Sequence, residues 1–189
     1  MLLLLLAVPV GLAVGWLRGG SLLALRELPW RGGWFVAGAF LLRLAMALVP
    51  ARLVPTAAGG WSLAGYLVTY GSLAAAATWN RRLSGVPLLG LGCLANLTVI
   101  VAAGGAMPYW PRAGRWVAGG SGNLPAQLGH VPVAHLSGLW YLSDVFPLPG
   151  PLASVFSPGD AAIAAGACWL VAWGMVRPRR LARTSATQG

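Results

Sequence analysis

The chain has 189 residues, of which 58% are hydrophobic and only 8% are charged, and its mean hydropathy is +0.73. Soluble domains carry about a quarter charged residues, so this composition excludes an ordinary soluble enzyme. The formal net charge of +10 comes from arginines that lie in the loops between apolar stretches, not along one face, which excludes nucleic acid as a partner.

Apolar stretches that could form membrane-crossing helices recur along the chain. Hydropathy and length predict five spans, at about 1–17, 34–50, 61–79, 86–104 and 159–176. We therefore expect an all-α integral membrane protein with one transmembrane domain. A long outer-face segment, 105–157, separates the fourth and fifth spans, and a basic tail, 177–189, follows the last one.

The first stretch resembles a secretory signal in its leucine content but lacks a positive region before it. Met1 leads directly into the leucine run, and Arg18 follows the apolar segment. We interpret it as a retained helix with its N-terminus outside. Gly11 and Gly15 form a G-x-x-x-G pair, a spacing that lets a second helix approach closely.

The arginines are distributed unevenly between the two sides of this arrangement. The three segments predicted to be cytoplasmic hold nine of the thirteen, whereas the outer segments hold three. By the positive-inside rule the protein lies in the inner (plasma) membrane with its C-terminus in the cytoplasm. The tail arginines are then placed to meet anionic lipid headgroups.

Two polar residues fall inside predicted spans and are candidate binding residues. Arg43 lies in the second span, where a charge usually faces the bundle interior. It either has a local partner, in a backbone carbonyl or in Asn80 or Asn96, or contacts a ligand. Asn96, in the fourth span, either joins two helices by hydrogen bonds or binds the same ligand.

The outer segment is rich in proline, tryptophan and tyrosine, so we expect it to lie on the outer leaflet and cap the bundle. Its middle is either a lipid-lying helix at 133–142 or an irregular lid. His130 and His135 are candidate binding residues there. Their spacing of five and the absence of a nearby cysteine argue against a metal site. Without a C-x-x-C motif we expect no cofactor.

Asp144 lies in this segment and Asp160 opens the last predicted span, and the two aspartates have two interpretations. Asp160 follows Ser157 and Pro158, a pattern typical of a helix N-cap. Alternatively, Asp144 and Asp160 face each other, share a proton and activate water as a catalytic dyad.

Several motifs between about residues 80 and 176 resemble an uncharacterised bacterial family of small multi-pass membrane proteins. They are Asn96-Leu97-Thr98-Val99-Ile100, Gly104-Gly105-Ala106-Met107-Pro108, Leu142-Ser143-Asp144-Val145-Phe146-Pro147 and Val155-Phe156-Ser157-Pro158-Gly159-Asp160. The chain departs from that family at Ala103, where the family pattern has asparagine. The resemblance implies a five-span fold and no known activity.

A second, local resemblance is to lipoprotein signal peptidase. Phe156, Ser157 and Asp160 match the motif that opens the last helix of that peptidase, and Asp144 takes the place of its upstream catalytic aspartate. The peptidase's asparagine-arginine region is missing here, and this chain has five predicted spans instead of four. The resemblance implies an aspartic peptidase-like hydrolase acting at the outer leaflet.

Three classes of function follow from the sequence. The first is a scaffold or accessory subunit without catalysis, whose partners are membrane lipids and a membrane protein or a second copy of the chain. The second is the hydrolase with Asp144 and Asp160. The third is lipid or small-molecule binding or transport through a bundle cavity near Arg43.

Overall fold

The computed structural model describes residues 2–48, 60–117, 130–135, 137–148 and 154–176. This part of the chain is mostly helical. The basic tail lies outside the described residues, so its contact with lipid headgroups stays a prediction.

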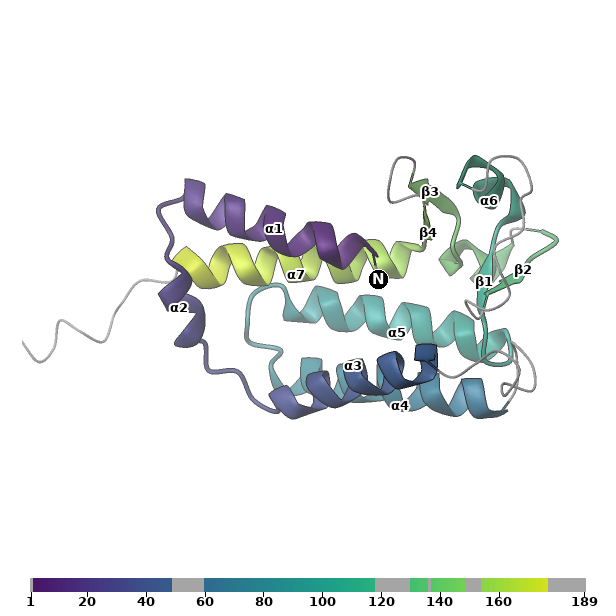
Figure 1. Cartoon of the computed structure of the whole chain (residues 1–189), viewed down its shortest axis with the longest axis horizontal. Coiled ribbons are helices and arrows are strands. Elements are labelled where there is room, and N and C mark those ends of the chain that lie inside the picture. Colours follow the sequence, from purple (N-terminus) through teal and green to yellow (C-terminus); the bar gives the residue numbers. More distant parts are fainter. Residues whose placement is uncertain (1, 49–59, 118–129, 136, 149–153, 177–189) are drawn as a thin grey trace, which may run out of the picture.

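Five long helices run side by side and make up most of the molecule (Figure 1). They are α1 (Leu2–Leu17), α3 (Gly33–Leu48), α4 (Gly60–Trp79), α5 (Val86–Ala102) and α7 (Pro158–Val176). Their positions confirm the helices that hydropathy predicts. By length and composition, α7 alone among the described helices is long and apolar enough to cross a membrane, while α1, α3 and α5 are shorter apolar helices. Five membrane crossings therefore stay a prediction.

The helices pack as two pairs joined through α5. One pair is α1 with α7 and the other is α3 with α4, and α5 packs against both α7 and α4. Glycines permit the closest approaches. A Cβ atom on Gly11 of α1 would lie 2.7 Å from the backbone oxygen of Cys168 in α7, so the predicted close helix contact at this glycine is present.

Hydrogen bonds link the two members of each pair at one end of the bundle. The Ser21 amide, just before the short helix α2 (Leu22–Arg26), donates to the Met175 carbonyl at the end of α7 over 3.0 Å. The Asn80 side chain, just after α4, exchanges two hydrogen bonds of 2.8 Å with the backbone of Arg31. Asn80 is therefore a structural link between α4 and the segment that leads into α3.

The opposite end of the bundle carries a small cap of short elements (Figure 1). Strands β1 (Met107–Tyr109) and β2 (His130–Pro132) pair in parallel, and β3 (Phe146–Leu148) and β4 (Ser154–Phe156) pair antiparallel. Helix α6 (Pro111–Val117) and a 3₁₀ helix (Gly138–Leu142) complete it. The predicted lid is thus built of short elements, and the alternative of one helix over 133–142 is wrong.

The cap is fastened to the bundle by apolar packing and a hydrogen bond. Met107 of β1 packs into a buried cluster with Tyr66 of α4 and with Val99 and Ile100 of α5. The Ser62 hydroxyl of α4 donates to the carbonyl of Gly105 over 2.6 Å. The segment from 105 to 109 therefore belongs to the same packed body as α4 and α5.

Candidate functional site

Asp160 forms the helix cap that its sequence pattern predicts. Its backbone amide donates to the Ser157 hydroxyl over 2.9 Å, and the Ser157 amide donates to a carboxylate oxygen of Asp160 over 3.5 Å. Pro158 begins the helix. These reciprocal bonds satisfy amides at the start of α7 that have no partner within the helix.

Asn96 of α5 ties this cap to the neighbouring helix. Its amide nitrogen donates to Asp160 Oδ1 over 2.8 Å, and its amide oxygen accepts from the Ser157 hydroxyl over 2.8 Å. Asn96 and Ser157 are both buried. A Cβ atom on Gly159 would lie 1.9 Å from the Asn96 oxygen, so only glycine lets Asn96 reach the helix end. The prediction that Asn96 joins two helices is confirmed.

Asp144 makes a different contact, with His130 in the cap. Its Oδ2 lies 3.1 Å from His130 Nε2, and its side chain is 4% exposed. The backbone of Asp144 extends the strand pairing, because its amide donates to Pro108 and its carbonyl accepts from Trp110, each over 3.0 Å. Asp144 follows His130 by 14 positions, and no periodic pattern in the sequence signals their pairing.

The His130–Asp144 pair is incompletely satisfied. Asp144 Oδ1 and His130 Nδ1 are buried and have no hydrogen-bond partner among the described residues. Burial is the main cause that raises the pKa of the Asp144 carboxyl above its usual value, and the hydrogen bond from His130 opposes this effect. The pair is a buried polar group that holds β2 against the backbone of the cap.

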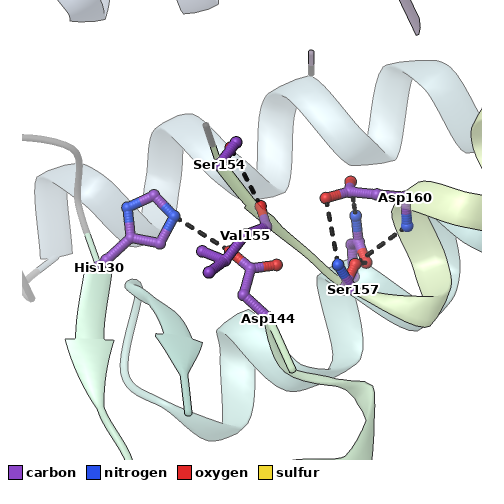
Figure 2. Close-up of polar contacts among 7 residues, drawn as sticks. His130, Asp144, Ser154, Val155, Ser157 and Asp160 are labelled. Atoms are coloured by element: carbon purple, nitrogen blue, oxygen red, sulfur yellow. Dashed lines mark hydrogen bonds and ion pairs between the residues drawn. The ribbon is translucent and has the colours of Figure 1, made fainter. Parts of the chain in front are cut away.

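The two carboxylates belong to separate groups, as Figure 2 shows. Asp144 bonds to His130, whereas Asp160 bonds to Ser157 and Asn96. No hydrogen bond joins Asp144 to Asp160 in the described part of the chain, whereas a dyad that shares a proton needs one. His135 is exposed and lines a separate recess with Trp140 and Ala103.

A cavity of about 380 Å³ lies among helices α1, α3, α4, α5 and α7. This volume falls within the range of small-molecule sites. Most of the lining is aliphatic or aromatic. It includes Leu3, Leu4, Val8, Val36, Ala39, Phe40, Leu73, Ala76, Leu89, Ile163 and Val171. Such a lining suits an apolar chain.

Four polar side chains also line the cavity: Arg43, Thr69, Tyr70 and Asp160. The Arg43 guanidinium lies over the ring of Tyr66, with Cζ 4.5 Å from the ring centroid. Among the described residues no hydrogen bond joins Arg43 to Asn80 or Asn96, since Asn80 bonds to Arg31 and Asn96 bonds to Ser157 and Asp160. Sequence reasoning found Arg43 and Asp160 but missed Thr69 and Tyr70, which resemble ordinary interior residues of a helix.

Thr69 differs from the other helical threonines that the structure describes. The hydroxyls of Thr78 and Thr98 each donate to the backbone carbonyl four residues earlier, over 2.9 and 2.8 Å. Thr69 is 4% exposed, yet its hydroxyl has no hydrogen-bond partner among the described residues. A buried hydroxyl without a partner is costly, so a polar group in the cavity would satisfy it.

Comparison with protein families gives one match, over residues 27–172, to DUF5317, a family of unknown function. The match includes Arg43, Asn96, His130, Asp144 and Asp160 but not α1. Comparisons with curated proteins and with solved structures found no match. Because the matched region covers most of the chain, this protein belongs to the DUF5317 family.

Proposed function

We propose that this protein is a multi-pass membrane protein that binds a lipid-like amphiphile inside its helix bundle. The observation that carries the proposal is the cavity of about 380 Å³, with its apolar lining and four polar side chains. Ligand sites between the helices of a bundle typically combine a mostly apolar wall with a few polar groups that orient the ligand.

The outer surface of the bundle supports a membrane setting. Large apolar side chains are exposed on every long helix. On α3, for example, they are Trp34, Phe40, Leu41, Leu44 and Leu48. Soluble monomers rarely expose contiguous apolar patches of this kind. A bilayer would cover these side chains and would remove the need for a protein partner to bury them.

The arrangement of charge supports the proposed orientation. The described arginines near the end of the bundle that holds Asn80 are Arg18, Arg26, Arg31, Arg81 and Arg82, whereas Arg112 and Arg115 belong to the cap. With this arginine-rich end in the cytoplasm, as the positive-inside rule favours, the cap lies at the outer leaflet and α7 ends on the cytoplasmic side.

Filling the cavity tests the proposal. Ala39 lines the cavity and is 3% exposed, whereas Ala45 on the same helix is exposed and does not line it. We expect Ala39→Phe to lower the amount of co-purified lipid by about tenfold, because the phenyl ring occupies the binding space and overpacks the site. Native mass spectrometry of the full chain released from detergent micelles measures the retained lipid directly.

Ala45→Phe is the matched control and should retain lipid at the wild-type level. Val36→Trp, a second cavity-filling change, covers the case in which Ala39→Phe does not fold. Wild-type levels of retained lipid in both folded cavity variants would contradict the proposal and would favour a scaffold role without a ligand.

A further inference from the structure

Arg43 is a cation that has no anionic partner within the described part of the chain. It lies within α3 and lines the cavity, and the structure shows no hydrogen bond or ion pair from its guanidinium among the described residues. The ring of Tyr66 covers one face of the guanidinium but accepts none of its five N–H donors, and no other described side chain or carbonyl does so. An arginine inside a membrane-facing bundle is costly unless an anion or another acceptor satisfies these donors.

Asp160 is the other described charged group that lines the cavity, and its carboxylate is already engaged. One oxygen accepts from the Asn96 amide and the other from the Ser157 backbone amide. Because both donors are neutral, Asp160 keeps its negative charge, but its oxygens already accept hydrogen bonds. Among the described lining residues, the charged group left to bind a ligand is therefore Arg43, and its N–H donors favour an anionic ligand over a cationic one.

The charged side chains of the lining lie toward the cap end of the bundle, whereas the lining toward the arginine-rich end is apolar. Arg43 is five residues from the end of α3 and Asp160 is near the start of α7, both toward the cap. Trp30, Ala77 and Val86 line the cavity toward the arginine-rich end and pack in or against one apolar cluster there. The unpartnered Thr69 hydroxyl lies midway along α4.

We infer that the ligand is an amphiphile with an anionic head, a carboxylate or a phosphate, which Arg43 binds on the cap side while the apolar tail extends toward the arginine-rich end. Guanidinium matches both anions because it donates two parallel hydrogen bonds to their oxygens. Thr69 supplies a further donor to the polar part of the same ligand. This inference rests on the proposed function, since it assigns the chemistry of the ligand in the proposed cavity.

Binding of three probes with the same chain length tests the inference. The probes are palmitate, palmitoyl lysophosphatidic acid and neutral hexadecanol, titrated into the full-length protein in an uncharged detergent at alkaline pH. We expect at least one anionic probe to bind about tenfold to a hundredfold more tightly than hexadecanol, as a charge-assisted hydrogen bond predicts. The anionic probe that binds more tightly identifies the head as carboxylate (palmitate) or phosphate (palmitoyl lysophosphatidic acid).

Arg43→Gln should remove that preference and leave hexadecanol binding unchanged, and Arg43→Lys should restore part of it. Arg112→Gln is the matched control, because Arg112 stacks on Trp110 in the cap and does not line the cavity. Equal binding of anionic and neutral probes, or a preference that survives Arg43→Gln, would overturn the inference while the proposed function stands. Failure of all three probes to bind would overturn both.

Discussion

The contact between Asp144 and His130 shows how a single buried pair can hold an irregular segment in place. Removing a carboxylate from water costs several kcal/mol, and one hydrogen-bonded partner offsets only part of that cost. The backbone of Asp144 also bonds to β1, so its side chain cannot leave without disturbing the strand pairing. The pair therefore links the position of β2 to the protonation of one carboxyl group.

The protonation of Asp144 should make stability depend on pH. The fold raises the pKa of its carboxyl above the ordinary 3.8, chiefly by burial. The folded state therefore binds a proton more tightly than the unfolded state, and the stabilisation present below pH 3.8 is lost as pH rises through the raised pKa. Between pH 3.8 and the raised pKa, the free energy of unfolding of the wild type should fall, relative to that of Asp144→Asn, by up to about 1.4 kcal/mol per pH unit.

Thermal unfolding in detergent at a series of pH values measures this difference. His130→Gln provides the control. Loss of the imidazole removes the interaction that lowers the pKa of Asp144, so the pH range over which stability falls should extend to higher pH. Parallel pH profiles for the wild type and Asp144→Asn would contradict the assignment.

At the scale of elements, the contact between α5 and α7 depends on glycine. Gly92 and Gly159 lie against each other, and a Cβ atom on Gly92 would be 2.5 Å from the Gly159 oxygen. The close approach also brings Asn96 to the start of α7. The helix pair and its polar link are thus one structural unit.

Replacement of Gly159 by alanine should push α7 away from α5 and weaken the hydrogen bonds of Asn96 to the start of α7. The new methyl group would meet the Asn96 side chain, so we expect a loss of about 1–3 kcal/mol in the free energy of unfolding. Gly71→Ala in α4 is the matched control. Apart from its chain neighbours and the backbone of its own helix, no described atom lies within 4 Å of its added Cβ, so the change should be neutral or should stabilise by up to about 1 kcal/mol. Equal unfolding transitions for the two variants would contradict the packing described here.

Hydropathy predicts the long helices because each is a continuous apolar run, and the cap at Asp160 is predictable because its partner Ser157 is three residues away. The described strands of the cap span three residues each, and β1, β2 and β3 contain a proline, so no alternating pattern marks them. The link between Asn96 and Asp160 spans 64 residues and depends on helix packing that sequence spacing does not encode. The cavity is unpredictable for the same reason.

At the scale of the whole molecule, the orientation in the membrane can be tested on either side of the bundle. Ser137 is exposed in the cap, and Ser84 lies in the connection between α4 and α5. With Cys93 and Cys168 replaced by serine, we expect Ser137→Cys to react with a membrane-impermeant maleimide in intact spheroplasts. Ser84→Cys should react only after lysis. The reverse labelling pattern would indicate the opposite orientation. If neither variant reacts before lysis, the result would contradict a cap on the outer side.

The bonds among Asn96, Ser157 and Asp160 join three parts of the molecule, since Ser157 follows β4, Asp160 lies in the first turn of α7 and Asn96 belongs to α5. Followed from donor to acceptor, they form a closed circuit with one sense: the Asp160 amide to the Ser157 hydroxyl, that hydroxyl to the Asn96 oxygen, and the Asn96 nitrogen back to the Asp160 carboxylate. Bonds that run in one sense polarise one another. Only an amide side chain at 96 can both accept and donate here, so an aspartate of the same shape would break the circuit and place two carboxylates together.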